Sequence, residues 1–379
     1  MALCASHHQS RRNRNGKLSH YLKQMKGLEV EVRSFYSENI EMESKEFVEM
    51  MLLDGCFIVE LFLNLKDRNA TAETDDPIYS TEWILPIIRL DMLLLENQLP
   101  FLVVKHIFQL VKGADASFSL LVELALRFFE HLMPMKKEIS SPISVFYSKN
   151  SIHHLLQLYH LHLIPTTLQS DTTDQGGNAA VAIYPDNIPV PPPPQSDTTD
   201  QGGNAAVAIY PDNIPVPPPP QSDTTDQGGN AAVAIYEDNR PVPPPRSIMS
   251  ASDLRHFLRL TKKENASSIV EVELKGGRLE IPTLWINHST NSILRNLIAW
   301  ELCYPKCGTQ FTSYAFFMDC LIDSPKDVAI LKDLNIIEHW LGNNEAVALL
   351  FNQMCIGLYL PRSHYALMSF VFQIEMEFS

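Results

Sequence analysis

The chain has 379 residues, of which 30 are Lys or Arg and 44 are Asp or Glu, and its formal net charge is −14. Binding to a nucleic acid requires a positive surface that displaces counterions from phosphates, so this charge argues against a nucleic-acid partner. Hydrophobic residues make up 45% of the chain and charged residues 20%, which is typical of a globular protein with a sizeable core. Six scattered cysteines favour free thiols in a reducing compartment.

The first residues carry no apolar segment of the kind found in a signal peptide. No run of about 18 apolar residues is present that could form a membrane-spanning helix. The sequence therefore predicts a soluble cytoplasmic protein. A basic cluster around Arg11, Arg12 and Arg14 predicts that residues 1–16 form a solvated, disordered tail.

Residues 17–168 form a first block with a helical pattern. The segment 43–65 has apolar residues on nearly every face, which predicts a buried helix. The segment 116–132 is amphipathic, with an apolar stripe at Leu121, Leu124 and Phe128. Both patterns favour a multi-helix domain.

The segment DMLLLENQLPFLVV (91–104) places polar groups among leucines. Proline favours the first turn of a helix, so we expect one helix over 86–95, a break at 97–99 and a second helix that starts at Pro100. Unpaired buried charges are costly, so the acids should be paired, with Glu96 bonded to Arg89 or to helix N–H groups. Amide side chains at the break should satisfy the two helix ends. The predicted structural elbow comprises Arg89, Asp91, Glu96, Asn97, Gln98 and Pro100; the alternative is a catalytic cleft that uses Asp91 and Glu96.

The sequence contains none of the short motifs of nucleotide-binding loops, zinc proteases or serine hydrolases. Four histidines lie close together: His153, His154, His160 and His162. Metal ligands must converge on one ion, and no carboxylate lies near these residues in sequence, so we expect partly buried helix histidines. Cys303 and Cys307 lack a second pair for zinc, and the apolar surroundings of Cys56 disfavour a reactive thiol. We therefore expect no metal, no cofactor and no catalytic residue.

A unit of 26 residues begins at Gln169, recurs verbatim from Gln195 and returns with changes from Gln221 to Arg246. Each copy has too little apolar surface to offset the entropy of ordering it, so the insert 169–246 is predicted to be disordered. In the third copy, Pro241, Pro244 and Arg246 have the spacing of a polyproline II peptide ligand. A stiff spacer is the simpler interpretation of the same residues.

The block 247–379 is expected to pack with 17–168 as one domain. Alternating residues on either side of Gly276-Gly277 predict a β-hairpin over about 269–281, because both turn positions need positive φ. Ser324 followed by Pro325 predicts a helix start, Gly342 its end, and Asn343 the cap of the next helix. The fold class is thus mainly α, with one small hairpin and a disordered proline-rich insert.

Five segments resemble, in order, the plant domain-of-unknown-function 247 family: MLLDGCFIVELF (51–62), DMLLLENQLPF (91–101), IHHLLQLYHLHLIP (152–165), LRNLIAWELC (294–303) and FMDCLIDSPKDVAILKDLNIIEHWLGNNEAVALLFN (317–352). The resemblance implies a mostly helical domain, a C-terminal membrane helix at the plasma membrane and, for some members, a part in pollen–stigma self-incompatibility. The family has no established catalytic residues to transfer. Here the opening motif with tyrosine and histidine has no counterpart before Lys17, and the expected membrane helix is absent, so both ends look clipped.

The leading hypothesis is a non-catalytic recognition domain with an unknown protein partner, in signalling or self-incompatibility as the resemblance implies. One alternative is an enzyme of unrecognised type that uses the polar residues of the elbow. Another is a truncated copy of the family without function.

Overall fold

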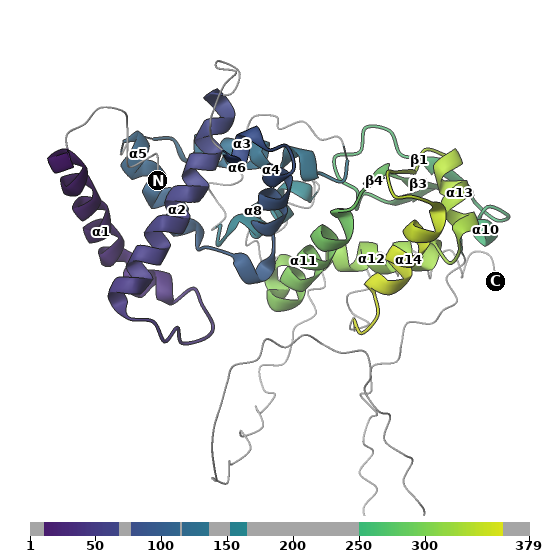
Figure 1. The fold of residues 1–379 in the computed structure, drawn as a ribbon. Helices are drawn as coiled ribbons and strands as arrows, with labels where there is room; N and C mark the ends of the chain where they lie inside the picture. Colours follow the sequence, from purple (N-terminus) through teal and green to yellow (C-terminus); the bar gives the residue numbers. More distant parts are fainter. Residues whose placement is uncertain (1–10, 68–76, 114–115, 136–151, 165–249, 359–379) are drawn as a thin grey trace, which may run out of the picture. The chain divides into compact units, whose positions relative to one another are not determined.

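The computed structural model describes residues 11–67, 77–113, 116–135, 152–164 and 250–358 (Figure 1). All the described residues belong to one compact unit. The described part is mainly helical with a few short strands, as the fold class predicted. The repeat insert, including Pro241, Pro244 and Arg246, lies outside the described residues.

In the N-terminal part of the compact unit, the described residues form helices and no strands (Figure 1). Its elements are α1 (Arg11–Arg33), α2 (Ser44–Asp67), α3 (Pro77–Ser80), α4 (Ile84–Asp91), the 3-10 turn η1 (Leu95–Asn97), α5 (Phe101–Lys112), α6 (Phe118–Phe129), the 3-10 turn η2 (Glu130–Leu132) and α8 (Leu155–Leu163). Because α1 begins at Arg11, the prediction of a disordered tail over 1–16 is wrong for its last six positions.

Helix α2 contacts α1, α5 and α6. The predicted helix over 43–65 is confirmed, but its full burial is not: Leu53 is 53% exposed and Phe57 is also exposed. These two positions are one helical turn apart, so one face of α2 is open to solvent. On the opposite side, Gly55 lies directly against α5, where a larger residue would meet Val103 and Ile107.

Two glycines inside helices give opposite predictions for the same substitution. A Cβ atom on Gly55 would lie 2.3 Å from Ile107 Cδ1 and 3.0 Å from Val103 Cγ1, whereas a Cβ on Gly27 in α1 would meet no atom within 4 Å. We expect Gly55→Ala to lower the free energy of unfolding by about 1–2 kcal/mol, because overpacking outweighs the helix preference of alanine. Gly27→Ala should raise it by about 0.5–1 kcal/mol. Urea denaturation of both variants measures the two changes in the free energy of unfolding. If both variants are stabilised or both are destabilised, the α2–α5 contact is contradicted.

A buried carboxylate joins α1 to the start of α2. Glu29 accepts hydrogen bonds from Lys26 Nζ at 2.6 Å, Arg33 Nε at 3.0 Å and Ser44 Oγ at 2.7 Å. Arg33 also donates to the carbonyl of Met42 at 2.8 Å, so the pair holds both the second helix and the loop before it. The bonds from Lys26 and then Ser44 lower the pKa of Glu29 from 4.5 to about 2.

This lowered pKa predicts a pH-dependent contribution to stability. A carboxylate with a depressed folded-state pKa stabilises the fold above its ordinary pKa, and that contribution is lost as the pH falls from about 5 to about 2. Because Lys26 is exposed to solvent, screening reduces the effect to about 1–2 kcal/mol. Between these pH values, the free energy of unfolding of Glu29→Gln should therefore fall less than that of the wild type. Urea denaturation at several pH values measures both. Parallel profiles for the variant and the wild type would refute the role of the network.

The described part of the C-terminal block combines helices with short strands (Figure 1). Its elements are α10 (Ala251–Leu254), β1 (Arg259–Lys262), β2 (Glu273–Lys275), β3 (Arg278–Ile281), β4 (Leu284–Ile286), α11 (Thr290–Cys303), the 3-10 turn η3 (Pro305–Cys307), α12 (Gln310–Leu321), α13 (Pro325–Asp333), β5 (Ile337–His339) and α14 (Asn344–Met354).

The predicted hairpin is present but shorter than 269–281. Strands β2 and β3 pair in the expected register, and Gly276 and Gly277 have φ of 54° and 74°. The chain turns before Glu273, because Val272 N donates to Val270 O at 2.9 Å, so the strands span only 273–281. Glu273 forms ion pairs with Lys263 at 2.6 Å and with Lys275 on the same strand.

Three further strands correct the expectation of a single hairpin. Strand β1 pairs in parallel with β3, so the first sheet has the order β1-β3-β2. Strands β4 and β5 form a second, parallel pair. Ser324 starts α13 and Asn343 caps α14 as predicted, but α13 ends at Asp333 and not near Gly342, because β5 intervenes.

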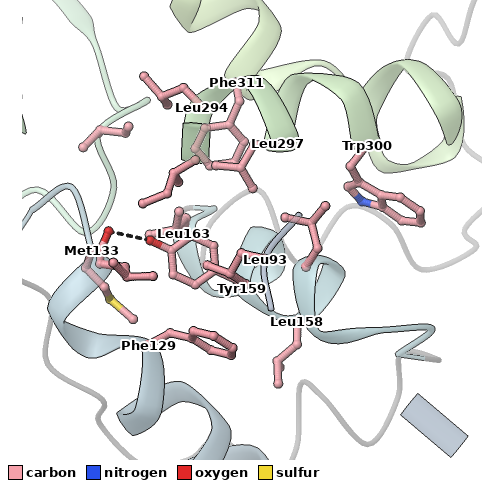
Figure 2. Packing of buried hydrophobic residues seen from close by; sticks show 14 of the residues in the cluster. Leu93, Phe129, Met133, Leu158, Tyr159, Leu163, Leu294, Leu297, Trp300 and Phe311 are labelled. Carbon is pink, nitrogen blue, oxygen red and sulfur yellow. Dashed lines mark hydrogen bonds between the residues drawn. The ribbon is translucent and has the colours of Figure 1, made fainter. Parts of the chain in front are cut away.

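Helix α8 links the two blocks through the core. It contacts both α6 and α11. Figure 2 shows Tyr159 of α8 between Phe129 of α6 and the side chains of Leu297 and Phe311. The buried Tyr159 hydroxyl donates to the carbonyl of Leu132 at 2.8 Å. This bond fixes the chain as it leaves η2.

Candidate binding groove

The amide side chains of the elbow close helix ends. Asn97 Nδ2 donates to the carbonyl of Asp91 at 3.0 Å, at the end of α4. Gln98 Nε2 donates to the carbonyls of Met92 and Leu94 at 3.0 and 2.6 Å, while Gln98 Oε1 accepts from Leu156 N in the first turn of α8. Pro100 is the residue before α5, which starts at Phe101. The amides thus bond to α4 and α8, whereas α5 receives none of these bonds.

The burial of the charged residues of the elbow differs from the prediction. Asp91 and Glu96 are both exposed, so the prediction that they are buried and paired is wrong. Arg89 is the buried charge, only 7% exposed, with its guanidinium carbon 5.2 Å from the centre of the Phe128 ring. Helix α4 ends at Asp91, four residues before the predicted end, which turns both acids toward solvent.

The four histidines do not converge. His160 is fully buried, and its Nε2 lies 3.0 Å from Glu301 Oε1 of α11. His154 packs edge-on against Trp300 at 4.4 Å, and its Nδ1 accepts from Gln157 N at 3.1 Å. Burial, followed by the charges of His153 and His160, lowers the pKa of His154 to about 4, so this ring is neutral at pH 7 and can cap α8. His162 is also buried.

A metal ion needs several His, Cys, Asp or Glu ligands around one point, and the described residues contain many such side chains. Among them, no group of three or more His, Cys, Asp or Glu side chains is placed to hold a metal ion. Cys303 is exposed and Cys307 half-buried, and both are free thiols. Burial raises the pKa of Cys307 to about 12.

An open cavity of about 520 Å³ lies where η2 meets the second strand pair. Of the described residues, seven line this cavity, which is called the binding groove below: Glu130, His131, Met133, Met135, Trp285, Asn287 and Trp340. Its volume is within the range of about 300–1,000 Å³ that is common for ligand sites. None of the elbow residues is part of it.

Backbone hydrogen bonds place the three segments of the groove side by side. Trp285 N of β4 donates to Pro134 O at 2.7 Å, and Trp340 N donates to Ile286 O at 2.9 Å. Strand β4 therefore has the segment 133–135 along one edge and β5 along the other. Leu284 and Ile286 point into the core, so the alternation of the strand turns Trp285 outward.

The two tryptophans dominate the groove. Their ring centroids are 6.4 Å apart and their planes are nearly perpendicular, at 89°. Trp340 is 62% exposed, while Met133 and Met135 form a buried apolar base beside them. A large aromatic residue that stays exposed beside flexible methionines is typical of a surface that packs against a partner.

The groove was not predicted from the sequence. Its residues come from three distant segments, at 130–135, 285–287 and 340. The available signal was the position of Trp285 between two strongly apolar strand residues, which indicates an aromatic side chain on the outward face of a strand. That signal requires β4, which the sequence analysis did not predict.

These features define a mainly helical domain with short strands and an open aromatic groove. The chain belongs to the plant family DUF247, described as "Plant protein of unknown function", whose model matches residues 2–376. This confirms the resemblance seen in the sequence. Among the described residues, no helix is both long and apolar enough to cross a membrane.

Two proteins of Arabidopsis thaliana are similar to this chain. UPF0481 protein At3g47200 is 30% identical over 336 residues, which cover 86% of this chain and 57% of that protein. Putative UPF0481 protein At3g02645 is 28% identical over 119 residues, which cover 31% of this chain and 22% of that protein. The chain thus spans little more than half the length of the first relative. No solved structure was found to match it.

Proposed function

We propose that this protein is a recognition domain that binds a partner protein through the groove of Trp285 and Trp340. The observation that carries the proposal is the 62% exposure of Trp340, in a cavity whose base is formed by Met133 and Met135. Tryptophan is the residue type most enriched among interface hot spots, and such residues dominate binding when they fill a pocket. The proposal extends to a place in signalling or self-incompatibility, which the family resemblance supports.

The groove also has the construction expected of a binding surface. The Tyr159 hydroxyl fixes the Leu132 carbonyl, and the β4 backbone fixes Pro134, so the methionines are presented from an anchored segment. A surface that is already ordered loses less entropy on binding. The strands thus position the aromatic rings, and the buried core positions the strands.

Trp340→Ala should weaken the affinity for the partner by about 30-fold or more, the effect of removing a hot spot worth about 2 kcal/mol. The melting temperature should change little because the side chain is exposed. Quantitative affinity capture from plant extract should detect proteins that bind the wild type and are lost with Trp340→Ala.

Trp83→Ala is the matched control, since Trp83 is 66% exposed at the start of α4 and does not line the groove. A captured protein that is lost with both variants reflects non-specific binding to exposed tryptophan. The proposal is refuted if every captured protein binds Trp340→Ala as well as it binds the wild type.

A further inference from the structure

We infer that the groove recognises an arginine side chain in an exposed peptide segment of the partner. The inference rests on the proposed function and adds the chemistry of the group that binds against the tryptophans. Two observations carry it: the arrangement of the indole rings and the charge around them.

The rings offer a surface suited to a planar cation. The face of an indole attracts cations within about 6 Å of the ring centre. Trp285 and Trp340 pack edge to face, with centroids 6.4 Å apart and planes at 89°, and the 62% exposure of Trp340 leaves ring surface on which a guanidinium can stack with one edge free. The N–H groups on that edge remain available for a carboxylate, as the forked geometry of arginine allows.

The groove contains such a carboxylate. Glu130 is an exposed residue of the lining, and of the described residues that line the groove none is a lysine or arginine. The register of the parallel pair places exposed Glu338 directly opposite Trp285, which adds a second acid beside the rings. No described basic residue forms an ion pair with Glu130 or Glu338, so neither acid is already neutralised within this part of the chain.

Besides Glu130, the described polar residues of the lining are Asn287 and the exposed His131, and the Asn287 oxygen is already engaged. Asn287 Oδ1 accepts from Ser289 N at 2.9 Å and from Ser289 Oγ at 2.7 Å, which leads the chain into α11. The net charge of −14 also favours encounter with basic segments, because complementary charge raises association rates. Arginine is preferred to lysine because its planar group stacks and pairs at the same time.

A random peptide library displayed on phage tests the inference with the full chain. Peptides that bind the wild type are selected, and those that also bind Trp340→Ala are removed. We expect the surviving peptides to share an arginine. Replacing that arginine by glutamine should weaken binding tenfold or more, and replacing it by lysine should weaken binding several-fold, as measured by fluorescence anisotropy.

Protein variants then identify the carboxylate. Glu130→Gln should weaken binding of the arginine peptide about fivefold and leave the glutamine version of the peptide unaffected. Glu38→Gln removes the same charge from an exposed position in the loop between α1 and α2, and it should bind like the wild type.

The outcomes separate this inference from the proposed function. Peptides that depend on Trp340 but share no arginine, or that bind as tightly with lysine, would overturn the arginine assignment and leave the recognition function standing. If no peptide discriminates the wild type from Trp340→Ala, both the inference and the proposed function fail.

Discussion

Replacing Glu301 by alanine is expected to lower the free energy of unfolding by about 3–5 kcal/mol, because it breaks a fully buried hydrogen-bonded network. The carboxylate accepts from Phe311 N at 2.9 Å, from Thr312 N at 2.8 Å and from Thr312 Oγ at 2.6 Å. It also lies 3.0 Å from His160 Nε2. Alanine would leave these groups in the core without an acceptor.

A graded series of variants tests this network. Glu301→Gln keeps the shape of the side chain but turns an amide donor toward another donor. We expect it to lose less free energy of unfolding than Glu301→Ala and more than the control variant. Thr312→Val is the control: it removes only one hydroxyl and should cost about 1 kcal/mol. Urea denaturation followed by circular dichroism measures the order. If Glu301→Ala lies within 1 kcal/mol of the wild type, the network is not required for stability.

The network matters because of the elements that it joins. His160 lies on α8, Glu301 near the end of α11, and Phe311 and Thr312 in the first turn of α12. Two of the bonds satisfy N–H groups that every helix start leaves open. The same contact between α8 and α11 fixes the core that supports the groove, so loss of Glu301 should also weaken partner binding.

The parts of the fold that could be predicted from sequence are those with local chemistry. The apolar pattern of α2, the glycine turn between β2 and β3, and the caps at Ser324 and Asn343 each depend on a few adjacent residues. The family membership could be recognised for the same reason, since its motifs are contiguous segments.

The missed elements depend on partners far along the chain. Strands β4 and β5 have three residues each and pair in parallel across about fifty intervening positions, so neither carries a strong pattern of its own. Helix α13 ends at Asp333 because Asn335 adopts a left-handed conformation with φ 55°. Ile336 N then donates to Leu331 O at 2.9 Å, and Asn335 N to Lys332 O at 2.9 Å, which is the Schellman motif. Asparagine is a weaker signal for that motif than glycine.

The candidate site could not be predicted for a related reason. Asp91 and Glu96 were the residues of the alternative catalytic cleft, because polar residues among leucines indicate buried charge. The early end of α4 exposes both acids, while the Asn97 and Gln98 amides donate to backbone carbonyls where that helix ends. The groove instead joins a segment before α8 to strands more than a hundred residues later, which only the packed structure brings together.

The second large effect is expected for Asp327, a buried carboxylate that holds the starts of two helices. Its Oδ2 accepts from Ser324 N at 2.9 Å at the start of α13, and its Oδ1 accepts from Ser252 N at 2.8 Å and Ser252 Oγ at 2.5 Å in α10. Asp327→Ala should lower the free energy of unfolding by about 2–4 kcal/mol, since a cap contributes about 1 kcal/mol and bonds to a charged group about 1.5–3 kcal/mol.

The pH dependence of stability distinguishes the contribution of the charge of Asp327 from that of its shape. Burial raises the pKa of Asp327, but the hydrogen bonds from Ser252 and Ser324 outweigh it and hold the pKa below its ordinary value of 3.8. The stabilisation is thus complete above pH 3.8 and is lost as the pH falls below it. Asp327→Asn should be less stable than the wild type at pH 7, and the difference should narrow in acid. Ser252→Ala, which removes a single hydroxyl, should cost about 1 kcal/mol at pH 7. A difference between Asp327→Asn and the wild type that stays constant with pH would show that the charge of Asp327 does not hold these helices.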